Sequence, residues 1–163
     1  MALHVRLSGK DEDLQWLRFG AGSGKLCEQI LSSTDNLVDS YILELSAELR
    51  ERQQTYLRQK LGFEIYERIS WLDRLPPDFS GVVLANEVLD AMPVKLLMRA
   101  GGQWCERGVA LTDDAVLAWA DTPTDLRPAM EVPGTHDYLT EIHPQAEAFI
   151  RTLADKLTQG AAF

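Results

Sequence analysis

Short apolar runs alternate along the first half of the chain with stretches in which apolar residues recur every three or four positions. This alternation predicts strands separated by helices, the pattern of a parallel α/β sheet wound by right-handed crossovers. The predicted strands are residues 14–19, 40–45, 63–66 and 81–85. The last of these is nearly all apolar, which is typical of a parallel strand covered on both faces.

Three helices fit between and after these strands. The first follows a glycine-rich turn that ends the first strand. The second begins after Ser46, whose hydroxyl can cap it, and ends at Gly62. The third opens at Pro144 and ends at Gly160, and residues 161–163 are predicted to begin a fifth strand.

The pattern changes after residue 94. Residues 95–99, 103–111 and 115–120 are predicted strands with hairpin-length connections, which indicates a β-meander at about residues 95–120. Residues 121–136 contain three prolines and a glycine and form a long irregular loop, the kind that often covers a site. We therefore predict a single Rossmann-like domain, residues 1–163, with a β-meander inserted after its fourth parallel strand.

Composition narrows the class of protein. With 163 residues, 45% of them hydrophobic, the chain can build one ordinary core. Its net charge of -9 repels a polyanion, so nucleic-acid binding is not expected. Two cysteines cannot form a disulfide framework, and the three histidines lack metal-ligand spacing. No apolar run approaches a membrane span and no secretory signal is apparent, so we expect no membrane insertion and a location in the bacterial cytoplasm.

The glycine-rich turn is the first candidate for chemistry. Gly20, Gly22 and Gly24 stand at alternate positions between a strand and a helix, where the backbone can approach a ligand closely and the helix offers free N–H groups. A dinucleotide usually requires the third glycine one residue later. The GxGxG spacing favours S-adenosylmethionine, although a purely structural tight turn remains the alternative.

Glu44 is the second candidate, because it ends the second predicted strand. A carboxylate there can accept hydrogen bonds from both hydroxyls of a ribose. A surface acid is the alternative explanation for Glu44 taken alone. Together with the glycine-rich turn, Glu44 predicts an adenosyl cofactor.

The third candidate is the segment that follows the fourth predicted strand. Asn86, Glu87 and Asp90 lie there, beyond the carboxyl end of a strand, where open α/β sheets bind their ligands. Two carboxylates in this position can hold a cation or take a proton from a nucleophile. Alternatively, Glu87 and Asp90 are an acid and a cap at the start of a helix.

Five segments of the chain form a recognisable set of motifs: FGAGSGKL, YILELSAELRERQ, the Trp71-Leu72 segment, ANEVLDAMPV and TEIHPQAEAFI. Together they resemble the MidA-like family of S-adenosylmethionine-dependent methyltransferases, which includes a mitochondrial complex I assembly factor that methylates an arginine of a respiratory-chain subunit. The resemblance runs from about Leu14 to Phe163, and NEVLDAMPV with the glycine motif is its most specific part.

This resemblance implies a class I methyltransferase core and protein arginine N-methylation. It implies catalytic or substrate-side roles for Asn86, Glu87 and Asp90. The implied partner is a protein substrate, with a respiratory-complex subunit as the candidate. Apart from the resemblance, a homodimer is a further expectation. One departure is Arg18, which stands where the family usually has an acid. Cofactor binding is assigned to Gly20, Ala21, Gly22, Gly24, Glu44 and Leu45.

The resemblance also implies a longer chain, in which a further strand and an aspartate-tyrosine-glycine motif follow the late helix. The sequence is therefore expected to be truncated at its C-terminus. Two other functions stay open. One is a non-catalytic cofactor-binding or assembly module, and the other is an NAD-dependent oxidoreductase, which the glycine spacing disfavours.

Overall fold

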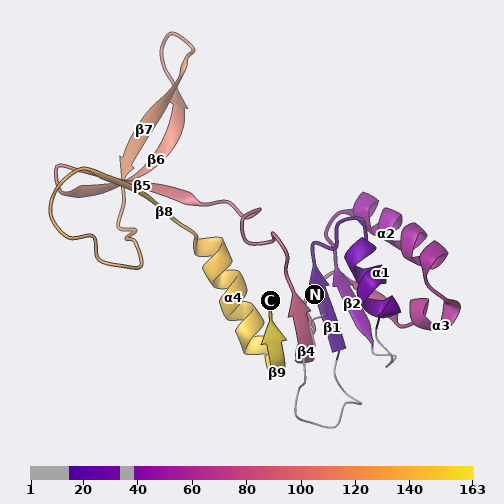
Figure 1. Cartoon of the computed structure of the whole chain (residues 1–163). Helices are drawn as coiled ribbons and strands as arrows, with labels where there is room; N and C mark the ends of the chain where they lie inside the picture. The colour runs from indigo at the N-terminus through magenta and orange to yellow at the C-terminus, as the bar shows by residue number, and fades with distance from the viewer. Residues whose placement is uncertain (1–14, 34–38) are drawn as a thin grey trace. The chain divides into compact units, whose positions relative to one another are not determined.

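The computed structural model describes residues 15–33 and 39–163. The predicted position of Leu14 in the first strand lies outside these ranges. The described residues fall into two compact units (Figure 1). The first unit comprises the residues up to Leu89 together with Arg151–Phe163, and the second comprises Asp90–Ile150.

The first unit contains a five-stranded sheet in the order β3-β2-β1-β4-β9, in which every neighbouring pair is parallel. This order matches the first five strands of the Rossmann arrangement, 3-2-1-4-5-6. The prediction of an α/β fold with a parallel sheet is thus confirmed. The strands are β1 (Gln15–Phe19), β2 (Ser40–Leu43), β3 (Ile69–Leu72), β4 (Phe79–Leu84) and β9 (Leu157–Ala162).

Helices α1 (Lys25–Ser32) and α2 (Ala47–Lys60) pack on one face of this sheet (Figure 1). As predicted, the Ser46 hydroxyl caps α2 by accepting a hydrogen bond from the backbone N–H of Leu49 at 3.3 Å. The apolar residues of both helices pack with those of β2 and β3 in a single core, and this packing stabilises the helices. That core consists of Ala21, Cys27, Leu31, Ile42, Leu57, Leu61 and Ile69.

The predicted strand at residues 63–66 is wrong. Phe63–Tyr66 forms a single helical turn, α3, in which the backbone N–H of Tyr66 donates to Gly62 O at 3.0 Å. Strand alternation would bury Phe63 with Ile65, yet Phe63 is 77% exposed while Ile65 and Tyr66 pack on the core. Aromatic and β-branched composition misled the prediction, because four residues are too few to separate the two periodicities.

The predicted end of the third helix at Gly160 is also wrong. Helix α4 (Pro144–Lys156) begins at Pro144 as predicted, but β9 starts directly after it and contains Gly160. The fifth strand therefore exists but begins four residues earlier than expected. Pairing with β4 explains the difference, since the Thr158 hydroxyl donates to Phe79 O at 2.9 Å and the ladder continues to Phe163.

The second unit is a four-stranded antiparallel sheet in the order β7-β6-β5-β8. The three predicted strands of the β-meander are present, but the third covers Leu117–Pro123 instead of residues 115–120. A fourth strand, β8, was missed because it pairs with β5 across about forty residues and has no local hairpin signal. The strands are β5 (Lys95–Ala100), β6 (Gln103–Leu111), β7 (Leu117–Pro123) and β8 (Tyr138–Ile142).

Arg99 connects the predicted irregular loop, residues 121–136, to this antiparallel sheet through hydrogen bonds. Its side chain is 5% exposed, lies over the ring of Trp104 at 5.4 Å and donates to the backbone carbonyls of His136 (3.1 Å) and Val132 (2.8 Å). Trp104 therefore packs against its own unit, and the loop is ordered by a buried cation.

Candidate functional site

The glycine-rich turn follows β1 and leads into α1. Gly20, Gly22 and Gly24 all have positive φ, at 54°, 53° and 84°. The turn closes with a hydrogen bond from Gly24 N to Ala21 O at 2.9 Å. A Cβ on Gly22 would have no described atom within 4 Å, so the backbone is bare on the side where a ligand can approach.

The first turn of α1 offers N–H donors next to these glycines. Gly24 is its N-cap in the left-handed conformation, and no side chain of the described residues caps this end. Helix N-termini leave backbone N–H groups without intrahelical partners, and these attract anions. The turn and the helix end are therefore suited to the carboxylate of an amino acid.

Glu44 follows β2, and its carboxylate is fixed at both oxygens. Oε1 accepts a hydrogen bond from the backbone N–H of Ser46 at 3.0 Å, and Oε2 accepts one from Gln53 Nε2 at 3.0 Å. Each oxygen keeps a further lone pair. An ordinary surface acid before a helix can make the local contact with Ser46, but the contact with the buried Gln53 side chain favours the functional interpretation of Glu44.

Gln53 of α2 was not found from the sequence. It is completely buried, and its amide nitrogen also donates to Gly22 O at 3.0 Å, while its amide oxygen accepts from Trp71 Nε1 at 3.2 Å. One side chain thus joins the glycine-rich turn, Glu44 and β3. A signal was available, because Gln53 stands four residues before the buried Leu57 and so shares the apolar face of α2.

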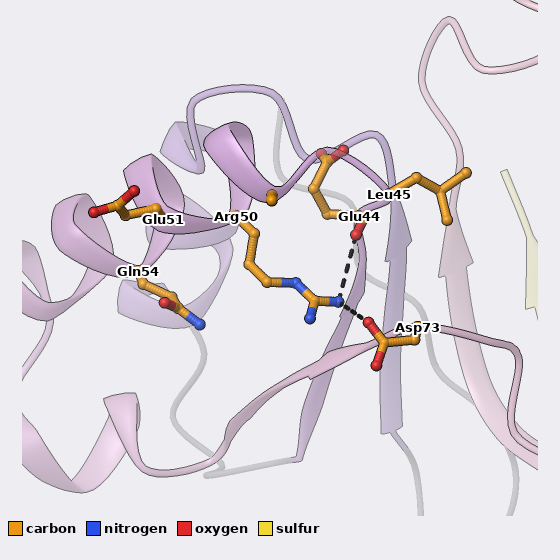
Figure 2. Close-up of a pocket in the computed structure, with 7 residues that line it drawn as sticks. Glu44, Leu45, Arg50, Glu51, Gln54 and Asp73 are labelled. Atoms are coloured by element: carbon orange, nitrogen blue, oxygen red, sulfur yellow. Dashed lines mark hydrogen bonds and ion pairs between the residues drawn. The ribbon is translucent and has the colours of Figure 1, made fainter.

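A pocket of about 250 Å³ opens beside Glu44 at the carboxyl ends of β2 and β3. Arg50 closes one side, where it pairs with Asp73 at 2.8 Å and donates to the backbone oxygen of Glu44 at 3.4 Å (Figure 2). It also donates to Leu72 O at 2.9 Å. Leu45 adds an apolar wall and is 84% exposed. The pocket is lined by Glu44, Leu45, Ala47, Arg50, Glu51, Gln54 and Asp73.

Arg18 points into the core. It is 6% exposed and lies with Cys27, Ile30 and Ser40 beneath α1. Burial lowers the pKa of the Arg18 guanidinium and raises the pKa of the Cys27 thiol, and the proximity of each group partly offsets the other's shift. The residue that departs from the family pattern thus faces the body of α1.

Burial of Cys27 gives a prediction about its reactivity. Because its pKa is raised and it is 2% exposed, it stays a protonated, inaccessible thiol, and iodoacetamide at pH 8 should modify it only after unfolding. Cys105 is only half-buried and should react in the native chain. Mass spectrometry of tryptic peptides measures both, and equal labelling of the two cysteines without denaturant would contradict the described packing.

The segment after β4 passes beside the glycine-rich turn. A Cβ on Gly20 would lie 3.5 Å from Val88 Cγ2, so Val88 borders the turn, and the exposed side chains of Asn86 and Glu87 come just before it. Glu87 has φ 51°, which is uncommon for a residue with a side chain and is often found at functional sites. Asp90 belongs to the second unit, so its pairing with Glu87 stays a prediction.

The described residues of the turn, of Glu44 and of the pocket beside it fit an adenosyl cofactor. The open backbone at Gly22, the fixed Glu44 carboxylate and the adjoining pocket provide an anion-binding turn, a ribose acceptor and room for a ring. The described residues contain no group of three or more His, Cys, Asp or Glu side chains that could hold a metal ion. None of the helices described is long and apolar enough to cross a membrane.

Comparisons with known proteins agree with this picture. Residues 2–163 match the family described as "Putative S-adenosyl-L-methionine-dependent methyltransferase". A native crystal structure of an uncharacterised protein from Burkholderia thailandensis is 39% identical with a TM-score of 0.78. A second structure from that organism, bound to S-adenosyl-homocysteine, is 38% identical with a TM-score of 0.77. No curated protein matches.

A Rossmann-like sheet with a glycine-rich turn and a carboxylate after its second strand is the arrangement of the class of nucleotide-binding α/β folds. The chain belongs to the S-adenosyl-L-methionine-dependent methyltransferase family. The predicted cofactor is the cofactor of this family. The two Burkholderia structures are each matched over 92% of this chain, which spans 42% and 41% of their lengths.

Proposed function

We propose that this chain binds S-adenosylmethionine between the glycine-rich turn and Glu44, and that it takes part in methyl transfer to a protein arginine in the cytoplasm, as MidA-like enzymes do. The observation that carries the proposal is the Glu44 carboxylate, which is fixed by Ser46 and Gln53 at the edge of the turn. Such restraint is expected of a group that must meet a ligand in one orientation.

Each part of the cofactor has a proposed set of partners. The amino-acid part lies across Gly20, Ala21, Gly22 and Gly24, where the N–H donors of α1 meet its carboxylate. Glu44 accepts the ribose hydroxyls. Leu45 and the pocket beside it take the adenine ring, because this pocket combines an apolar wall with the carboxylate of Asp73 as a hydrogen-bond acceptor.

When bound, S-adenosylmethionine supplies an electrophilic methyl group on a positively charged sulfur. Transfer then depends mainly on how the protein holds the acceptor. We assign that task to Glu87 and Asp90, whose carboxylates polarise the guanidinium and take up its proton, with Asn86 as a hydrogen-bonding partner. The net charge of -9 favours a cationic acceptor.

Glu87→Ala tests this assignment. We expect the variant to lose methyl transfer at least about 100-fold, the scale of a lost acid–base group. The affinity for S-adenosyl-homocysteine should remain unchanged. Glu87 is exposed, and among the described residues it makes no hydrogen bond to those proposed to bind the cofactor. The measurement is transfer of tritiated methyl groups to acid-precipitated protein of a bacterial extract.

Glu64→Ala is the matched control, since Glu64 is an exposed acid in α3 and should change neither quantity. Undiminished transfer in Glu87→Ala would refute the role of Glu87. A chain that binds S-adenosyl-homocysteine but transfers no methyl group even without substitution would instead support the non-catalytic module.

A further inference from the structure

We propose that Gln53 is a positioning residue of the cofactor site, which holds the Glu44 carboxylate at a fixed place relative to the glycine-rich turn. The inference rests on the proposed function and adds a residue that neither the glycine motif nor the end of β2 contains. Gln53 would not touch the cofactor; it would act through Glu44 and through the carbonyl of Gly22.

The orientation of the Gln53 amide is determined by its partners. Its nitrogen donates to two acceptors, Gly22 O and Glu44 Oε2, and its oxygen accepts from the indole N–H of Trp71. A flipped amide would place oxygen against a carbonyl and a carboxylate, and would place two donors against each other at Trp71. One orientation alone satisfies this network.

Because the Gln53 amide has a fixed orientation, it also fixes the Glu44 carboxylate that it contacts. Rotation of the carboxylate would break the hydrogen bond from Ser46 at Oε1 or the one from Gln53 at Oε2. The remaining lone pairs of the Glu44 carboxylate therefore have a fixed direction before a ligand binds. This lowers the loss of side-chain entropy on binding. The same amide ties Glu44 to Gly22, so the ribose acceptor and the turn that takes the amino-acid part keep a constant separation.

Burial makes these hydrogen bonds costly to lose. Gln53 has 0% exposure and stands four residues before Leu57, which is also fully buried. A polar side chain on an apolar helix face is unfavourable unless all its donors and acceptors are paired. The Gln53 amide can make all its hydrogen bonds only when the glycine-rich turn, β2 and β3 are folded together. Its pairing is therefore coupled to the folding of the whole site.

Gln53→Met is the principal test, because methionine has a similar shape and lacks the amide. By calorimetry on the full chain, affinity for S-adenosyl-homocysteine should fall about tenfold, the effect of one charge-assisted hydrogen bond. The unaltered chain should prefer S-adenosyl-homocysteine over its analogue without the ribose 2′-hydroxyl, and Gln53→Met should lose that preference. The double variant with Glu44→Gln should bind no more weakly than Glu44→Gln alone.

Controls separate this inference from the proposed function. Gln59→Met alters an exposed glutamine of the same helix and should bind normally. If Gln53→Met does not fold, Trp71→Phe is the alternative test. It removes the hydrogen bond to the Gln53 amide oxygen and should weaken the binding of S-adenosyl-homocysteine about threefold. Folded variants with unaltered affinity and preference, or losses that add in the double variant, overturn the inference alone. An unaltered chain that binds no S-adenosyl-homocysteine overturns the proposed function and this inference together.

Discussion

Glu44→Gln is expected to lower the affinity for S-adenosyl-homocysteine by about 10- to 100-fold. Hydrogen bonds to a charged acceptor contribute about 1.5–3 kcal/mol, and each 1.4 kcal/mol is a factor of about ten. Glutamine keeps the size of the side chain, but it replaces one acceptor oxygen with a donor. That donor would face either Gln53 Nε2 or the N–H of Ser46, so the fixed orientation is lost as well. Isothermal titration calorimetry measures the effect directly.

Glu48→Gln provides the matched control for this prediction. Glu48 lies in the first turn of α2, is 83% exposed at its side chain and forms a long ion pair of 3.9 Å with Arg52. Its replacement should leave the affinity within about twofold, because exposed ion pairs contribute little. If Glu44→Gln and Glu48→Gln bound S-adenosyl-homocysteine equally well, Glu44 would be a surface acid and the ribose assignment would be wrong.

Gly81→Ala is expected to unfold the first unit or to destabilise it by about 4 kcal/mol or more, which is large against a typical total of about 5–15 kcal/mol. Gly81 lies in β4 with φ 155°, and a Cβ there would overlap the backbone of Gln15 in β1. The neighbour is a strand backbone, so it cannot move aside as a flexible side chain would. Urea unfolding followed by circular dichroism measures the loss of stability.

Gly108→Ala is the control for this substitution. Gly108 also lies in a strand, β6, but a Cβ there would meet no described atom within 4 Å. Its replacement should change the free energy of unfolding by about 0.5 kcal/mol or less. A Gly81→Ala chain as stable as Gly108→Ala would show that β1 and β4 do not approach each other as described.

The positions of the main site elements could be predicted because their signals are local. An apolar run that stops at alternate glycines requires a strand, a tight turn and a helix, and β1, the turn and α1 follow that order. Glu44 was found by its place at the end of a strand. These signals require no knowledge of distant contacts.

Elements that depend on distant contacts were missed or misplaced. The β8 strand pairs with β5, and residues 157–160 become strand through their pairing with β4. Phe63–Tyr66 has strand-forming composition but forms a helical turn, in which Ile65 and Tyr66 pack against the core. Tertiary packing decided each case over local preference.

The restraint of the site could be predicted only in part. The spacing of Gln53 from Leu57 places it on the buried face of α2, whereas its neighbour Gln54 lines the pocket. That spacing does not identify Gly22 and Glu44 as the partners of the Gln53 amide. Likewise, the sequence shows Arg18 where the family usually has an acid but does not show that its neighbours are Cys27, Ile30 and Ser40 under α1. Which way a side chain points depends on the face it occupies once the sheet is assembled.

The central claim is tested most directly by two parallel calorimetric titrations of the unaltered chain. One uses S-adenosyl-homocysteine as the ligand and the other uses NAD. The account predicts saturable binding of one S-adenosyl-homocysteine per chain and no binding of NAD. Absence of S-adenosyl-homocysteine binding at millimolar concentration, or equal binding of NAD, would contradict the claim that the glycine-rich turn and Glu44 form an S-adenosylmethionine site.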